Sequence, residues 1–207
     1  YIDKTYNCTY NMICQRINMQ HKIELKKVGF KTVFPKARQF YKALSENRDR
    51  LSPWFWWTEE RVTPTYAKTL VFMTAYILDT KRKKLMHTLD KKKPYDEQFL
   101  ILNNANFAGM TGLDNIDNTK KDAEMWYFVT HENEGKGIAS KAIKILEHYT
   151  FDNKSLYSIY VKTAKGNNRS EKIMERNQYR LSVIEWNVPT SRRNPKITDL
   201  KTWIKQK

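Results

Sequence analysis

Residues 122–139 constrain this chain more than any other stretch, because their sequence, DAEMWYFVTHENEGKGIA, predicts a strand, a tight loop and a helix start in succession. Residues 123–130 are rich in aromatic and β-favouring side chains, which is typical of a buried strand. Across residues 138–150, apolar side chains recur at helical spacing. Gly135 and Gly137 lie between the two elements, and glycines allow backbone N–H groups to face an anion at a helix start.

This loop has two interpretations, a phosphate cradle and an ordinary turn followed by a helix cap. Two glycines spaced GxG do not distinguish them. The chain contains neither GxxxxGK(S/T) nor GxGxxG, the two common phosphate-binding motifs. A phosphate-binding loop in this chain must therefore belong to another class.

The composition allows one well-buried domain with a basic surface. Hydrophobic residues make up 40% of the 207 residues, which is enough to build a core. The net charge of +16 favours a polyanionic partner, such as RNA, the ribosome or a phosphorylated cofactor, although a solvated basic surface gives the same count. Cys8 and Cys14 are too few for a disulfide framework or a cysteine-based zinc site, and no apolar run reaches transmembrane length. We therefore expect a soluble, cytoplasmic protein without a metal or a membrane contact.

We expect residues 1–20 to form an N-terminal arm, disordered or an extension, and residues 21–207 to form one domain. The periodicity predicts a mixed α/β order: a strand, two helices, a three-strand meander, then helix, strand, helix and two closing strands. The predicted strands cover residues 21–28, 98–102, 107–116, 123–130, 156–164, 179–188 and 200–205. The predicted helices cover residues 34–48, 63–78, 138–150 and part of 166–177.

Two further stretches have both a structural and a functional interpretation. Residues 51–57, LSPWFWW, either fill an edge of the core or contribute Trp54 and Trp57 to the wall of a substrate pocket. Residues 79–93 carry seven lysines and arginines against two aspartates, so they form either a solvated extension or a patch that contacts a polyanion. The residues of this stretch expected to contact RNA are Lys81, Arg82, Lys83 and Lys84.

Four short stretches, in order, resemble the GNAT superfamily of acetyl-CoA-dependent N-acetyltransferases, most closely its RimJ/RimL-type ribosomal-protein N-acetyltransferases. LSPWFWW resembles that group's LxPWLPW, AEMWYFVT its AEIGYWL, EGKGIAS its QGKGIAT, and NNRS the NxxS that opens its last helix. Together they cover about residues 21–182. The resemblance implies a GNAT-like mixed α/β (α+β) fold, whose mostly antiparallel central sheet has about six to seven strands flanked by about four helices.

The resemblance also implies that acetyl-CoA is the acetyl donor. In this superfamily the strand before the loop splays from its neighbour and pairs its backbone with the pantetheine arm, as a ligand added to a sheet edge does. The cofactor-pairing residues would be Phe128, Val129 and Thr130, and the pyrophosphate-binding loop would comprise Glu134, Gly135, Lys136, Gly137, Ile138 and Ala139. Glu132 stands at the first position of the usual pattern (Q/R)xxGx(G/A), and two carboxylates here are unfavourable unless they point away.

For catalysis, the resemblance points to Glu124 as the base that deprotonates the acceptor amine. Alternation along a strand puts Glu124, Trp126 and Phe128 on one face, so the carboxylate would lie among aromatic rings and Trp126 would line the acceptor site. A structural carboxylate is the alternative interpretation of Glu124. His131, beside the loop, is the alternative base, although a lone histidine in a turn is commonly a surface residue.

The resemblance links Asn167 and Ser170, which fit NxxS, to positioning of the cofactor and protonation of its thiolate. The same residues also suit a helix cap and a first-turn position, and the two roles are compatible. Met174 occupies the place where many superfamily members carry a tyrosine on the last helix. A tyrosine acid is therefore not available at that position.

The leading hypothesis is an acetyl-CoA-dependent N-acetyltransferase acting on a protein N-terminal amine, such as that of a ribosomal protein. The alternative acceptors are an aminoacyl-tRNA, a polyamine and an aminoglycoside. The net charge of +16 argues against a cationic drug, whose site should be acidic. A catalytically inactive RNA- or ribosome-binding protein on the same fold is the alternative from another class, and oligomers of this chain are compatible with either.

Overall fold

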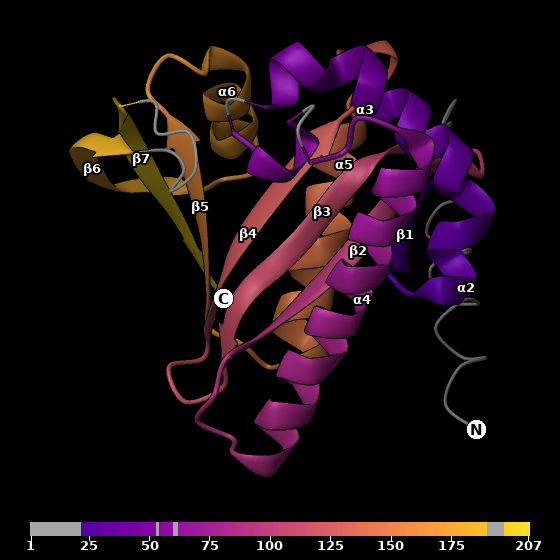
Figure 1. Ribbon diagram of the computed structural model, residues 1–207. Coiled ribbons are helices and arrows are strands. Elements are labelled where there is room, and N and C mark those ends of the chain that lie inside the picture. The colour runs from indigo at the N-terminus through magenta and orange to yellow at the C-terminus, as the bar shows by residue number, and fades with distance from the viewer. Residues whose placement is uncertain (1–21, 53, 60–61, 190–196) are drawn as a thin grey trace.

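In the computed structural model, which describes residues 22–52, 54–59, 62–189 and 197–207, a seven-stranded sheet carries helices on both faces (Figure 1). The expected arm of residues 1–20 lies outside the described residues. The strands are β1 (Ile23–Lys27), β2 (Tyr95–Asn103), β3 (Asn106–Asp117), β4 (Asp122–Val129), β5 (Ser158–Ala164), β6 (Arg180–Pro189) and β7 (Ile197–Gln206). Their order is β1-β2-β3-β4-β5-β7-β6, and β4 with β5 is the one parallel pair of this sheet. The predicted mixed, mostly antiparallel sheet is confirmed.

The helices divide between the two faces of the sheet. α2 (Phe30–Val33) leads through a 3-10 turn into α3 (Ala37–Leu51), and α4 (Tyr66–Leu89) follows the Trp-rich loop. α5 (Ile138–His148) ends in a π-helical turn, and α6 (Asn168–Arg176) precedes the hairpin of β6 and β7. α4 lies across β2 and β3, whereas α5 lies behind the sheet (Figure 1). None of the helices in the described part of the chain is long and apolar enough to cross a membrane.

Strand alternation gives each face its own core. On one face, buried residues of α3 and α4, among them Leu44 and Met73, pack against Met110 and Phe128 of the sheet. On the other face, residues of α5 pack against alternate residues of β3, β4 and β5, which are Leu113, Ala123, Met125, Ile159 and Val161. The two-residue period of a strand therefore explains how β4 serves both cores.

The length of α4 is the largest difference from the sequence-based expectation, which ended this helix at residue 78. The helix continues to Leu89, so Lys81, Arg82, Lys83 and Lys84 are helical, whereas Lys91, Lys92 and Lys93 follow its end. Asp79 pairs with Arg82 at i,i+3 and with Lys83 at i,i+4. Because such pairs stabilise a helix, a dense run of charge was the wrong signal for its end.

The sheet opens between β4 and β5. The two strands pair at Asp122 with Ser158, Ala123 with Ile159 and Glu124 with Tyr160, and their register ends there. β5 continues along β7 to Ala164, while β4 continues along β3 to Val129. The strands therefore diverge toward α6, as the resemblance implied (Figure 1). We call this opening the β4–β5 fork.

Candidate active site

The loop between β4 and α5 has the backbone that a phosphate cradle requires. Gly135 and Gly137 both have φ of 72°, a left-handed conformation that favours glycine. Gly137 is the N-cap residue of α5, and no side chain caps the helix there. Residues 135–137 are exposed, whereas the side chains of Ile138 and Ala139 are buried in the first turn. An anion can therefore reach the backbone amides at the start of α5.

The carboxylate of Glu134 is held by two arginines from other elements. Arg50, near the end of α3, donates to Glu134 Oε1 at 2.5 Å, and Arg169, in the first turn of α6, binds Glu134 Oε2. One carboxylate between two guanidinium groups leaves a net charge of +1, so an anion at the loop meets positive charge. Glu132 is exposed. The unfavourable charge expected at Glu134 is thus compensated.

Sequence reasoning missed both arginines. Arg50 belongs to no motif, and Arg169 fills a variable position of NxxS. Arg50 also donates to the carbonyl oxygen of Val129 at 2.7 Å, while the N–H of Thr130 donates to Ala108 at 2.9 Å. Two backbone groups of the segment expected to pair with pantetheine are therefore occupied within the protein.

Asn167 and Ser170 lie at the start of α6, as predicted. The side chain of Asn167 accepts a hydrogen bond from the N–H of Ser170 at 3.3 Å, so Asn167 caps the helix. The hydroxyl of Ser170 lies beside that of Tyr127 on β4. Burial raises the pKa of Tyr127 to about 12, and the contact with Ser170 opposes this rise. Sequence reasoning assigned nothing to Tyr127.

Glu124 lies at the base of the β4–β5 fork. Its carboxylate is 3.6 Å from the Nζ of Lys162 on β5, and its side chain is 36% exposed. The side chain of Glu124 is therefore partly open to solvent and has a cationic neighbour, in addition to the aromatic residues that share its face of β4. The physical reason is its position at the last β4–β5 pair, where the side chain meets β5 and solvent.

Asp114 of β3 lies directly opposite Glu124, and side chains of opposite residues share one face of a sheet. Burial raises the pKa of Asp114 to about 6, and Asp96 and Glu124 add to the rise, against hydrogen bonds from Trp126 and Gln98. The Gln98 bond measures 3.3 Å between Nε2 and Oδ1. A carboxyl group that titrates near neutral pH is suited to accept a proton. Sequence reasoning missed Asp114, because it belongs to no motif.

Trp126 lies flat against Gly112 of β3. A Cβ added to Gly112 would come within 2.8 to 2.9 Å of three atoms of the indole, so only glycine leaves room for the ring. Phe55 packs against Trp126 with 5.7 Å between ring centroids. These contacts hold the indole beside Asp114, to which it hydrogen-bonds.

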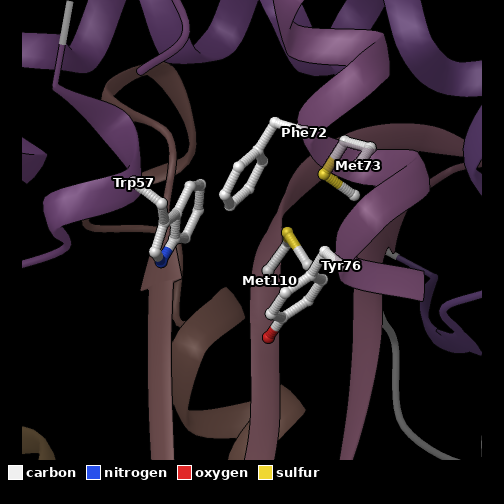
Figure 2. Close-up of a pocket in the computed structure, with 5 residues that line it drawn as sticks. All are labelled: Trp57, Phe72, Met73, Tyr76 and Met110. Carbon is white, nitrogen blue, oxygen red and sulfur yellow. The ribbon is translucent and has the colours of Figure 1, made fainter. Parts of the chain in front are cut away.

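Trp57, one of the two tryptophans expected to line a substrate pocket, borders a cavity that is too small for a substrate. Trp57 lines a small apolar cavity of about 10 Å³, the room of a single water molecule, and its ring faces that of Phe72 across it (Figure 2). The other lining residues are Met73, Tyr76 and Met110. Trp57 also stacks on Phe40 in the core, with 6.3 Å between ring centroids. Trp54 is 41% exposed and does not line this cavity.

The four basic residues of α4 that were expected to contact RNA all have partners within the protein. Arg82 pairs with Asp79 at 2.8 Å, Lys83 with Asp96 at 2.5 Å, and Lys84 with Glu97 at 3.4 Å. The Nζ of Lys81 lies 4.8 Å from the ring centroid of Phe30. In addition, the described residues contain no group of three or more His, Cys, Asp and Glu side chains arranged to hold a metal ion.

The β4–β5 fork, the uncapped helix start beside it and the titratable groups around β4 define a class of protein. They suit a protein that binds an extended, phosphorylated ligand between two splayed strands. The chain belongs to the GNAT acetyltransferase family, because the family's model, described as an acetyltransferase (GNAT) domain, matches residues 41–180.

Relatives of known sequence and structure agree with this assignment. The Bacillus subtilis protein YdaF, to which a ribosomal N-acetyltransferase activity is ascribed, is 28% identical over 141 residues, 68% of this chain and 70% of YdaF. RimL, a ribosomal L7/L12 α-N-protein acetyltransferase solved with coenzyme A, has a TM-score of 0.70 and 17% identity, covering 89% of this chain and 93% of RimL. A Vibrio cholerae spermidine N-acetyltransferase, solved with coenzyme A and spermine, has a TM-score of 0.63 and 19% identity, covering 89% and 95%. The predicted resemblance, the fold and coenzyme A chemistry are confirmed at the level of the family.

Proposed function

We propose that the protein transfers the acetyl group of acetyl-CoA to a primary amine, and that this amine is the N-terminus of a protein, such as a ribosomal protein. One observation carries the proposal: the β4–β5 fork has carboxylates on the α4 side of β4 and hydroxyls on its α6 side. An acceptor amine must lose a proton and the departing thiolate must gain one. Glu124 and Asp114, on one face, could accept the proton of the amine, and Ser170, on the other face, could protonate the thiolate.

Acetyl-CoA supplies the thioester, and the loop and the fork would hold it. The amides of residues 135–139 and the side chain of Lys136 bind the pyrophosphate at the positive end of α5. Arg50 and Arg169 keep the charge around Glu134 favourable for that anion. The edge of β4 beyond Glu124 is not paired with β5, and its backbone groups other than the Val129 carbonyl oxygen and the Thr130 N–H would bind the pantetheine arm and the thioester oxygen.

Asp114 supports an amine as acceptor. Its hydrogen-bond donors, Gln98 and Trp126, are neutral, and the negative charges of Asp96 and Glu124 raise its pKa. Lys83 also interacts with Asp114, but its ammonium group pairs with Asp96 at 2.5 Å. The ammonium group of an acceptor would pair with this carboxylate directly, and a carboxyl with a pKa of about 6 can then take up the proton. Since this surface is locally acidic, the net charge of the chain was a poor guide to the acceptor.

A polyamine is the second candidate acceptor, and the same acidity favours it. Asp114 and Asp96 lie close enough to interact, and a polyamine offers more than one ammonium group to such a surface. The partners of Glu124 and Asp96, which are Lys162 and Lys83, reduce this advantage. RNA binding through the basic residues of α4 has less support, because all four already contact groups of the protein.

To test this proposal, the protein is incubated with acetyl-CoA and one of two acceptors. The acceptors are spermidine and a tetrapeptide that begins with serine, and the readouts are the release of free thiol and the mass of the product. We expect acetylation of the peptide. Acetylation of spermidine alone would replace the first candidate with the second, and failure to bind acetyl-CoA in calorimetry would refute both. Gly137→Trp should abolish that binding, because a side chain at φ of 72° is strained and blocks the loop, whereas Gly29→Ala should leave it unchanged.

The two carboxylates are compared in the same assay. Asp114→Asn and Glu124→Gln each remove a proton acceptor without changing side-chain shape. General-base catalysis contributes about 10²- to 10⁴-fold, so the variant that lacks the base should lose about 100-fold in kcat or more. Full activity in both variants would remove the α4 side of the fork from the mechanism.

A further inference from the structure

The hydroxyl of Tyr127 has no role in the fold or in the proposed reaction. It is buried and makes no well-aligned hydrogen bond within the described residues, although it lies beside the hydroxyl of Ser170. Buried polar groups are nearly always hydrogen-bonded, because an unpaired one destabilises the folded state. A buried phenol without such a bond therefore requires an explanation, and active sites are where such groups are retained.

Tyr127 lies inside the β4–β5 fork. It stands three residues beyond Glu124, the last residue of β4 that pairs with β5. Its neighbours in the strand, Trp126 and Phe128, face α4, so alternation turns Tyr127 to the α6 side. There its ring packs against the core that includes Met174 of α6, and its hydroxyl meets the first turn of that helix at Ser170.

We propose that Tyr127 donates the proton that the departing thiolate receives, with Ser170 as the intermediate group. The inference rests on the proposed acetyl transfer. As the C–N bond forms and the C–S bond breaks, the electron pair of the C–S bond leaves with sulfur. Sulfur takes a proton from Ser170, and Ser170 takes one from Tyr127. The phenolate regains a proton from water after the products leave, and the proton lost by the amine departs on the α4 side.

Ser170 needs such a partner for a chemical reason. An aliphatic hydroxyl is a much weaker acid than a thiol, so a serine that protonates a thiolate must have its own proton replaced at once. A phenol is a stronger acid than a serine hydroxyl, with an ordinary pKa of about 10. Burial, which raises the pKa of Tyr127 to about 12, keeps the phenol protonated at neutral pH. The α6 helix offers no alternative acid here, because its inward residue Met174 is apolar.

The other titratable groups on this side do not replace Tyr127. Burial raises the pKa of Tyr179, and the charge of Glu147 on α5 raises it further, so Tyr179 is a weaker acid. Lys205 of β7 donates to Glu147 Oε2 at 2.8 Å and to the backbone of Asn177. Lys205 and Glu147 therefore form an ion pair of their own.

The test is a double-mutant cycle of Tyr127→Phe and Ser170→Ala, read as kcat and KM with acetyl-CoA and the N-terminal serine peptide. We expect each single variant to lose about 100-fold in kcat with KM for acetyl-CoA nearly unchanged. Residues that act as one unit give non-additive losses, so the double variant should be no slower than the slower single variant. Tyr157→Phe is the matched control, since Tyr157 is 53% exposed, and it should behave as the wild type.

Three results would overturn the inference. They are an unchanged kcat in Tyr127→Phe, multiplicative losses in the double variant, and a lower Tm for Tyr127→Phe. The Tm matters because removal of an unpaired hydroxyl should leave the Tm unchanged or higher, whereas removal of a structural hydrogen bond lowers it. A wild-type protein that transfers no acetyl group would instead refute the proposed function, so the two failures are distinguishable.

Discussion

Glu97 of β2 and Asp114 of β3 are two carboxylates on opposite faces of the same part of the sheet. The surroundings of Glu97 lower its pKa, whereas those of Asp114 raise its pKa. Glu97 is fully buried and accepts from Lys27 at 2.6 Å, Lys154 at 3.0 Å and the Tyr149 hydroxyl at 2.6 Å. Burial alone would raise the pKa of Glu97, but these partners lower it to about 2.

Asp114 instead accepts hydrogen bonds from neutral donors, and burial, with the negative charges of Asp96 and Glu124, raises its pKa to about 6. Burial by itself therefore does not indicate whether a carboxylate has a structural or a functional role. A buried carboxylate with cationic partners within the fold contributes to stability, whereas one without them destabilises the fold until a ligand supplies the cation. The Glu97 centre is therefore structural, and the Asp114 centre is the candidate for function.

Glu97→Gln tests the structural role of Glu97 and should have the largest effect on stability. It leaves Lys27, Lys154 and Lys84 without their shared counter-charge, so we expect the free energy of unfolding to fall by about 3–5 kcal/mol. Urea denaturation measures this loss. Glu46→Gln is the control, because that exposed residue pairs with Lys42 at 3.7 Å and its loss should change stability by under about 0.5 kcal/mol. Equal losses of stability in both variants would contradict the structural role of Glu97.

The pH dependence of stability should separate the two carboxylates by sign. The pKa of Asp114 is raised from 3.8 to about 6, so the folded state binds a proton first and stability rises as pH falls from about 6 toward 3.8. The pKa of Glu97 is lowered from 4.5 to about 2, so its contribution, up to about 3 kcal/mol, is present above pH 4.5 and lost as pH falls toward 2.

Unfolding in urea between pH 3 and pH 7 checks both signs. Asp114→Asn should lack the rise in stability as pH falls from about 6 and be more stable than the wild type at pH 7. Glu97→Gln should lack the loss below pH 4.5. A wild-type protein and Asp114→Asn variant with parallel curves would contradict the raised pKa of Asp114.

Gly112→Ala should disturb the Asp114 centre alone. Its Cβ would come within 2.8 to 2.9 Å of the Trp126 ring, so the indole must move and its hydrogen bond to Asp114 weakens. We expect a loss of about 1–3 kcal/mol, as for other overpacked cores, and a further rise in the pKa of Asp114. Titration of Asp114 by NMR measures the pKa. Gly29→Ala, where the nearest atom would be 3.9 Å away, is the control and should change neither quantity.

Lys162→Met should have the smallest effect, because its pair with Glu124 is 43% and 36% exposed. We expect a change in stability under about 1 kcal/mol, as for other exposed ion pairs. The acetyl-transfer rate should change more than stability, since Glu124 loses the cation beside it. A stability loss as large as that of Glu97→Gln would show that exposure does not distinguish the two centres.

Much of the fold followed from local patterns. Five of the seven predicted strands begin within two residues of the observed ones, and the other two, 98–102 and 200–205, lie inside longer observed strands. The strand, loop and helix of residues 122–150 stand where periodicity and glycine placed them. These elements were predictable because period, turn residues and helix caps depend on neighbours along the chain. The end of α4 was not, because ion pairs within the helix and contacts with β2 outweigh the local excess of lysine.

The sequence by itself therefore determined the order of the elements, the position of the glycine loop before α5 and the resemblance to GNAT acetyltransferases. Only the tertiary structure decided which charges are compensated. Arg50 and Arg169 pair with Glu134, and lysines pair with Glu97, whereas the hydrogen-bond donors to Asp114 are the neutral side chains of Gln98 and Trp126. The tertiary structure also brought Tyr127 to Ser170. The reason is physical, because compensation and proton transfer depend on distances of a few ångströms between residues far apart in the chain, and no local pattern encodes those distances.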